Sequence, residues 1–118
     1  MIAIVDYGAG NLFSVKNACD FLGLSTQITG DAAALRAADG IILPGVGAFP
    51  DAMRQLTAHG LTAVLQEEAT KKPLLGICLG MQMLFEFGME FERTEGLGLL
   101  PGFVARMETG GRKLPHVG

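Results

Sequence analysis

The chain has 118 residues, which gives room for one domain with one core. Hydrophobic residues make up 49% and charged residues 18%, a balance typical of a folded protein rather than a disordered one. The net charge is −3, the basic residues are scattered and Trp is absent, so a nucleic-acid-binding function has little support. Apolar runs are short and broken by Gly and Pro, which predicts no membrane span, and the first residues lack the basic start of a signal peptide.

The chain has two cysteines, Cys19 and Cys78, far apart in sequence. A disulfide framework in so small a chain would need more of them, so we expect reduced thiols and a cytoplasmic location. The two histidines, His59 and His116, form no metal-ligand spacing with either cysteine. We therefore expect no metal and no other cofactor.

Strands and helices are predicted to alternate along the chain, starting with an apolar strand at the N-terminus. The predicted strands are residues 2–6, 25–28, 40–43, 73–78 and 103–107. The predicted helices are residues 12–22, a short segment capped by Asp31 and ending near residue 38, residues 50–72 with a break at Gly60, and residues 79–87. In the first helix Cys19 lies on the apolar stripe, so we predict that it belongs to the core.

This alternation predicts an α/β fold, a mostly parallel sheet flanked by helices on both faces. Ligands of such sheets bind at the C-terminal ends of the strands, so the loops after residues 6, 43 and 77 are the expected site. The chain ends at L-P-H-V-G without a closing helix or a polar tail. We expect residues 1–118 to be the N-terminal part of a single domain whose C-terminal part is absent.

The segment G-I-C-L-G (76–80) lies between a predicted strand and a predicted helix, which is the pattern of a nucleophile elbow with Cys78 in place of Ser. Glycines are needed on both sides because larger side chains would collide with neighbouring backbone. The thiol would stand at a helix start that favours the thiolate, and the Leu79 N–H could point at an oxyanion. The alternative is a buried cysteine in an ordinary strand–helix turn.

Two further glycine-rich loops follow predicted strands. The two glycines of P-G-V-G (44–47) allow backbone N–H groups to face a ligand, as an oxyanion hole requires, although a plain turn has the same composition. G-A-G-N (8–11) resembles the start of a dinucleotide-binding fingerprint, but the third glycine position holds Phe13. This mismatch argues against NAD binding.

G-I-C-L-G-M-Q (76–82) resembles the nucleophile segment of class I glutamine amidotransferases, and P-G-V-G (44–47) resembles their oxyanion loop. Within that family, residues 6–15 and 95–102 and the terminal L-P-H-V-G are similar to a glutaminase subunit of histidine biosynthesis. The resemblance covers the whole chain and implies the flavodoxin-like fold of the family.

The resemblance also implies a reaction. Cys78 would attack the side-chain amide carbon of glutamine, giving a glutamyl thioester and ammonia, with the N–H groups of Gly47 and Leu79 stabilising the oxyanion. Gln82 and Glu90 would hold the α-amino and carboxylate ends of the substrate, unless they are an ordinary helix residue and a solvated loop acid. The ammonia would pass to a cyclase subunit, a (β/α)8 barrel, in a heterodimer.

One departure from the family concerns the general base. The triad of the family is completed by a His-x-Glu pair downstream of the cysteine, and neither His59 nor His116 is followed by Glu two residues on. We therefore expect these 118 residues alone not to hydrolyse glutamine at a useful rate.

Other functions remain open for a cysteine on such a turn. The chain could belong to another glutamine amidotransferase, to a redox-sensing or chaperone protein of similar fold, or to a flavodoxin-like binding module in which Cys78 is inert. Selective labelling of Cys78 by a glutamine-analogue ketone would favour the amidotransferase.

Overall fold

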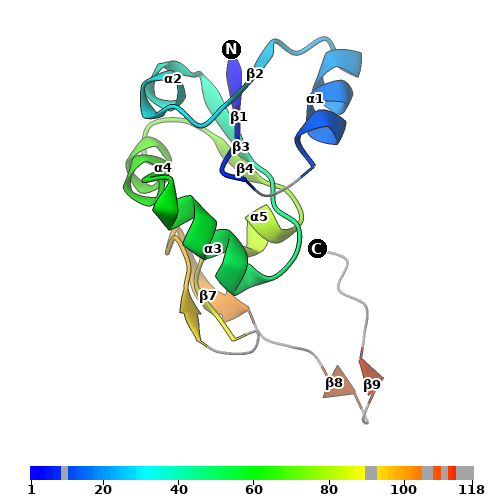
Figure 1. Cartoon of the computed structure of the whole chain (residues 1–118), viewed down its shortest axis with the longest axis vertical. Helices are drawn as coiled ribbons and strands as arrows, with labels where there is room; N and C mark the ends of the chain where they lie inside the picture. Colours follow the sequence, from blue (N-terminus) through cyan, green and yellow to red (C-terminus); the bar gives the residue numbers. More distant parts are fainter. Residues whose placement is uncertain (9–10, 90–92, 105–107, 110–111, 114–118) are drawn as a thin grey trace.

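The computed structural model describes residues 1–8, 11–89, 93–104, 108–109 and 112–113. Its main sheet has four parallel strands in the order β2-β1-β3-β4 (Figure 1). The strands are β1 (Ile2–Val5), β2 (Thr26–Thr29), β3 (Gly40–Leu43) and β4 (Leu74–Gly76). This arrangement confirms the predicted α/β class with a parallel sheet.

The helices between these strands are close to those predicted. They are α1 (Leu12–Phe21), α2 (Ala32–Ala37), α3 (Phe49–Ala58) and α4 (Thr62–Glu68). The side chain of Asp31 accepts the N–H of Ala33 at the start of α2, as predicted, and Asn11 caps α1 in the same way. Gly60, with a φ of +70°, separates α3 from α4 at the predicted break.

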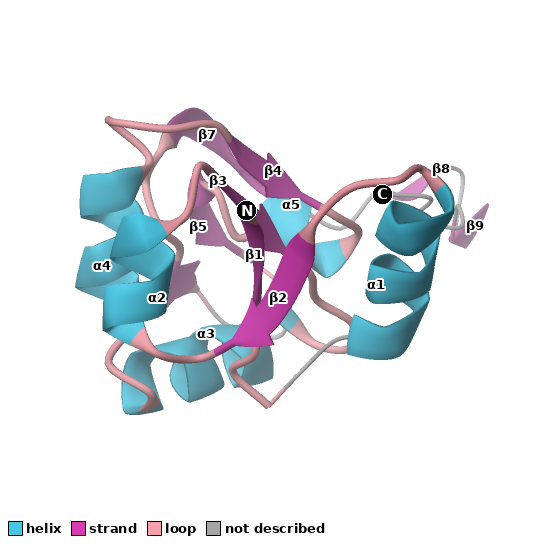
Figure 2. Ribbon diagram, turned by 90° about the horizontal axis from the view of Figure 1, so that it is seen from above, coloured by secondary structure: helices cyan, strands magenta, loops and turns pink. Residues whose placement is uncertain are grey.

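The two faces of the sheet carry different helices. Along β1, Val5 packs in the larger core cluster with residues of α2, α3 and α4, whereas Ile4 packs in a second cluster. This second cluster contains Ile42 of β3 and Cys19 of α1. Figure 2 shows α1 on one side of the sheet and α2, α3 and α4 on the opposite side. The buried position of Cys19, which is 6% exposed, confirms that it is a core residue.

After β4 the structure departs from the predicted helix over residues 79–87. Only a single turn forms, α5 (Leu79–Gln82), and the chain continues into β5 (Phe85–Gly88). The carbonyl of Met83 accepts the N–H of Leu97 at 2.8 Å and that of Leu84 accepts the N–H of Leu100 at 2.9 Å. Because carbonyls that would continue the helix bind a later segment instead, the helix prediction is wrong here.

Strand β5 belongs to a second, smaller sheet of order β6-β5-β7. It pairs with β6 (Thr94–Glu95) in antiparallel and with β7 (Leu100–Val104) in parallel orientation. The predicted strand over 103–107 lies partly in β7, and residues 105–107 are outside the described residues. A further antiparallel pair joins β8 (Glu108–Thr109) to β9 (Arg112–Lys113).

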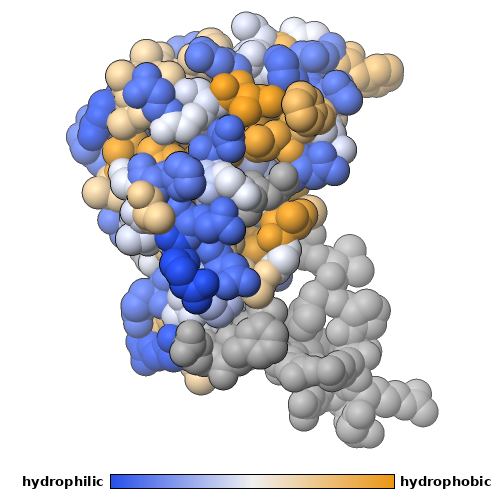
Figure 3. All heavy atoms as spheres, in the orientation of Figure 1, coloured by the Kyte–Doolittle hydropathy of each residue, from blue (hydrophilic) through white to orange (hydrophobic). Residues whose placement is uncertain are grey.

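Within the described residues, β4 has a neighbouring strand on one side only. Leu75 on this strand is 58% exposed, and Val46 and Met81 near its C-terminal end are also exposed. Because no described strand pairs with the other side of β4, the backbone of this edge is open to pairing with a further strand. On the face that Figure 3 draws, apolar side chains gather at the surface around the position of α1.

Among the described residues, no helix has the length and apolarity needed to cross a bilayer.

Candidate active site

The loops that follow β1, β3 and β4 lie against one another. The strand order places the topological switch point between β1 and β3, where ligands of open parallel sheets bind. The hydroxyl of Tyr7, just after β1, donates to the carbonyl of Pro44 at 2.7 Å. The N–H of Leu79, after β4, donates to the carbonyl of Gly45 at 3.1 Å. The three loops predicted to carry the site are therefore brought together.

Cys78 has an unusual backbone conformation, with φ +56° and ψ −124°. Among the described residues it is the one residue other than glycine with a positive φ. Such a conformation costs on the order of 1–3 kcal/mol, which the surrounding contacts must offset. The side chain is exposed and stands immediately before the first residue of α5.

The glycines beside Cys78 are required by close contacts. A Cβ at Gly76 would lie 2.6 Å from Cα of Met81, and a Cβ at Gly80 would overlap the carbonyl oxygen of Leu43. Gly45 on the neighbouring loop is equally confined, because its Cβ would lie 2.8 Å from the N of Gly80. The tight turn predicted from the glycine spacing is confirmed, and so is its steric reason.

Two backbone hydrogen bonds hold the cysteine turn against the loop after β3. The Ile77 N–H donates to the Leu43 carbonyl at 3.0 Å, and the Leu79 N–H donates to the Gly45 carbonyl at 3.1 Å. The Leu79 N–H, predicted as an oxyanion donor, is therefore occupied in this structure. α5 also has a single turn, which weakens the predicted contribution of a helix dipole at the thiol.

Gly47, the other predicted oxyanion donor, lies at an exposed point of the loop between β3 and α3. Its φ is +93°, and an added Cβ would meet no atom within 4 Å. Glycine is therefore favoured here by backbone conformation rather than by space.

The two residues predicted to bind the ends of the substrate have different outcomes. Gln82 is the last residue of α5 and is half-buried, one turn after Cys78. Glu90 lies outside the described residues.

Of the two histidines, only His59 lies within the described residues. His59 is the C-cap of α3, and its Nδ1 lies 2.8 Å from the carbonyl oxygen of Gln55. Its ring is therefore engaged at the C-terminus of this helix. His116 lies outside the described residues. In the part of the chain that the structure describes, no group of His, Cys, Asp and Glu side chains could hold a metal ion.

Tyr7 is part of this arrangement and was not singled out by the sequence analysis. It is fully buried, and its hydroxyl also lies 3.5 Å from the sulfur of Met83. Burial raises the pKa of Tyr7 to about 12, so the phenol stays protonated and able to donate. The available signal was the only tyrosine of the chain, placed directly after a buried strand.

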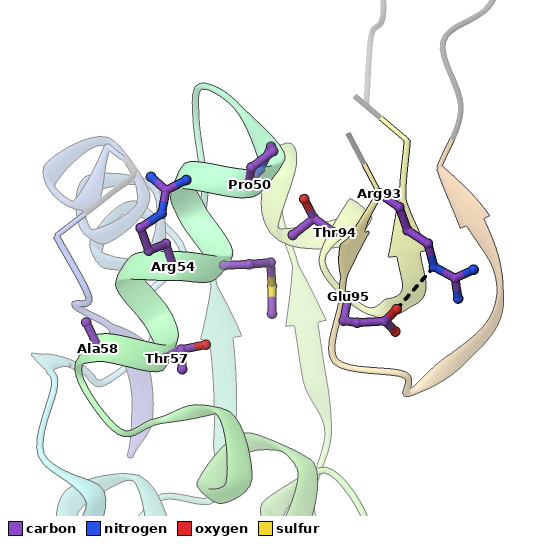
Figure 4. Close-up of a pocket in the computed structure, with 8 residues that line it drawn as sticks. Pro50, Arg54, Thr57, Ala58, Arg93, Thr94 and Glu95 are labelled. Carbon is purple, nitrogen blue, oxygen red and sulfur yellow. Dashed lines mark hydrogen bonds and ion pairs between the residues drawn. The ribbon is translucent and has the colours of Figure 1, made fainter. Parts of the chain in front are cut away.

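An open hollow beside α3 involves none of the predicted site residues (Figure 4). It lies between α3 and β6, and its charged side chains are already paired. Arg93 bonds Glu95 at 3.1 Å and Arg54 bonds Asp51 at 2.8 Å. The described residues to which the sequence analysis assigns the chemistry lie at the cysteine turn and the loop after β3, away from the lining of this hollow.

Comparison with known proteins shows the family to which the chain belongs. The family model described as glutamine amidotransferase class-I matches residues 3–112. The chain is 53% identical over its whole length to the "Imidazole glycerol phosphate synthase subunit HisH" of Lacticaseibacillus casei, and 51% identical to that of Listeria monocytogenes serotype 4a. It covers 58% of each of these two relatives.

A solved structure titled "Crystal structure of glutamine amidotransferase" has the same fold, with a TM-score of 0.75 at 20% identity. The similarity covers 90% of this chain and 57% of that one. The chain thus spans rather more than half the length of the relatives it matches. With a family model matched over nearly all its residues, it belongs to the class I glutamine amidotransferases.

Proposed function

We propose that this chain is part of the glutaminase subunit of imidazole glycerol phosphate synthase, which hydrolyses glutamine to glutamate and passes ammonia to a cyclase subunit. The proposal rests on the whole-length similarity to subunits of that name. The observation that carries the chemistry is the conformation of Cys78, whose φ of +56° between two confined glycines leaves its thiol exposed.

In the proposed reaction the thiolate of Cys78 attacks the side-chain amide carbon of glutamine. The tetrahedral intermediate collapses to a glutamyl thioester as the amine leaves with a proton as ammonia, and water then releases glutamate. The exposed side chain has the access that this attack needs. Cys19, which is buried in the core, has none.

The oxyanion would be stabilised by the N–H groups of Gly47 and Leu79. Since the Leu79 N–H donates to Gly45 in this structure, the Gly45 carbonyl must turn away before that donor can serve. Glycines stand on both sides of Val46 in this loop, and glycine can adopt backbone conformations that other residues cannot, which supports such a rearrangement. Gln82, at the end of α5, and Glu90 are proposed to hold the α-amino and carboxylate ends of glutamine.

A general base must take the thiol proton and return it to the departing amine. Neither histidine of this chain has the Glu two residues on that the family pairs with its catalytic histidine. His59 is also engaged at the end of α3. We assign no residue of this chain to that role.

The proposed partner is the cyclase, a (β/α)8 barrel that binds the glutaminase as a heterodimer and receives the ammonia. We place the protein in the cytoplasm in this proposal, because an unpaired nucleophilic thiol must stay reduced.

The test is Cys78→Ser in the full-length protein assembled with its cyclase. We expect glutamine-dependent synthesis to fall by at least about 10³-fold, because the hydroxyl is a far weaker nucleophile than the thiolate. Synthesis from added ammonium salt should stay at the wild-type rate, since the cyclase still receives its nucleophile. Equal loss of both activities would mean that Cys78 has a structural role only.

A further inference from the structure

Tyr7 joins three parts of the molecule through one buried hydroxyl. The residue follows β1, its hydroxyl donates to the Pro44 carbonyl after β3 at 2.7 Å, and the Met83 sulfur after α5 lies 3.5 Å away. Tyr7 is fully enclosed, and so is Pro44. Water therefore has no access to replace the phenol as donor to this carbonyl.

Three consecutive backbone carbonyls, where β3 ends and the following loop begins, each accept a hydrogen bond. The Leu43 carbonyl accepts from Ile77 N–H at 3.0 Å, and the Gly45 carbonyl accepts from Leu79 N–H at 3.1 Å. The carbonyl between them, that of Pro44, accepts from Tyr7. The cysteine turn thus binds the first and third of these carbonyls, and Tyr7 binds the second.

The third bond matters when the loop changes conformation. If the Gly45 carbonyl releases the Leu79 N–H to serve an oxyanion, one of the three bonds is lost. The loop is then held by the Leu43 and Pro44 carbonyls alone. Gly45 also lies close to the phenol, because a Cβ added at Gly45 would be only 2.9 Å from the Tyr7 oxygen. The Tyr7 side chain therefore leaves little room for Gly45 to move toward it.

We infer that Tyr7 is a positioning residue for the proposed glutaminase reaction. Its hydroxyl fixes the position of the Pro44 carbonyl at the start of the loop after β3. The backbone N–H donors of the oxyanion site therefore stay aligned with the thiol of Cys78. This inference rests on the proposed function. It assigns Tyr7 no contact with glutamine, and hence predicts an effect on turnover rather than on substrate binding.

The experiment uses the Tyr7→Phe variant of the full-length protein, assembled with its cyclase. This substitution removes the hydroxyl and keeps the ring. We expect kcat with glutamine to fall about tenfold, the effect of leaving one buried acceptor unpaired, while KM for glutamine changes by less than about twofold. Synthesis from ammonium salt should be unchanged. Met83→Leu is the matched control, since it alters the other neighbour of the hydroxyl and leaves the Pro44 bond in place.

Two further measurements separate positioning from simple packing. Inactivation by a glutamine-analogue chloroketone, which requires the oxyanion site, should slow about tenfold in Tyr7→Phe, whereas iodoacetamide should alkylate Cys78 at the wild-type rate. 4-Aminophenylalanine in place of Tyr7 supplies an N–H donor and should restore kcat. If Tyr7→Phe does not fold, 4-fluorophenylalanine in place of Tyr7 fills the space without donating, and the same tenfold loss is expected.

The outcomes are distinct. A lower melting temperature with unchanged kcat per folded molecule would overturn the inference and leave Tyr7 a core residue. Failure of 4-aminophenylalanine to restore kcat would overturn it as well. If the wild-type protein neither turns over glutamine nor reacts with the chloroketone at Cys78, the proposed function itself fails, and the inference fails with it.

Discussion

The two cysteines of this chain lie in regions with opposite properties. Cys19 is one residue of the apolar stripe of α1, 6% exposed and packed in the same cluster as Ile4 and Ile42. Cys78 is exposed, has a φ of +56° and follows β4, which ends at Gly76, two residues earlier than predicted from the sequence. The same side chain is thus a packing group in one region and an accessible thiol in the other. The backbone around each cysteine, rather than the residue type, decides the difference.

The largest effect that separates the two regions is expected in thiol labelling. A glutamine-analogue chloroketone should modify Cys78 at least about 10³-fold faster than Cys19, because Cys19 reacts only when the core opens. Added glutamine should protect Cys78. Peptide mass spectrometry of the full-length protein after partial labelling measures both rates. Labelling of Cys78 that is indifferent to glutamine would favour the redox or chaperone alternative.

A smaller effect is expected from substitutions at two glycines that both have a positive φ. Gly47→Val should lower glutamine turnover by about 10²–10³-fold, because Val disfavours the φ of +93° that orients this N–H, and one lost oxyanion donor usually has that effect. Gly23→Val is the matched control, because Gly23 has a φ of +76° and equally open surroundings at the end of α1, far along the chain from the cysteine turn. Both variants should lose about 1–2 kcal/mol of stability from strain.

Steady-state kinetics and thermal unfolding of the two variants give the comparison. If turnover per folded molecule is unchanged in both, the loop after β3 is only a turn.

The smallest effect is expected for Cys19→Ser. This change places a hydroxyl in the cluster between α1 and the sheet and should cost about 1–2 kcal/mol of unfolding free energy, measured by urea denaturation. Glutamine turnover per folded molecule should be that of the wild type. A fall in turnover that exceeds the fall in folded fraction would mean that α1 contributes to the reaction, and the contrast between the two cysteines would not hold.

The sequence alone determined the main sheet, its helices and the turn at Cys78. Short apolar runs such as residues 2–6 and 40–43 are typical of strands buried on both faces, and the spacing of Cys19 with its apolar neighbours predicts a helix packed on that sheet. Likewise, glycines on both sides of Cys78 predict a turn too tight for a Cβ, and the contacts of Gly76 and Gly80 agree. Such features are local, so the pattern of a few residues is enough.

Tertiary structure decided what depends on partners distant in the chain. The helix predicted over residues 79–87 stops at Gln82 because the carbonyls of Met83 and Leu84 bind backbone of residues 97–100. The Leu79 N–H has no partner that its own segment could predict, and in the fold it donates to Gly45. Likewise, the sequence around Tyr7 does not distinguish it from other residues that follow a strand. Only the fold shows that its hydroxyl donates to the carbonyl of Pro44, 37 positions away. Each of these hydrogen bonds joins segments that are distant in the sequence. No local sequence pattern tells which distant segments come within hydrogen-bonding distance in the fold.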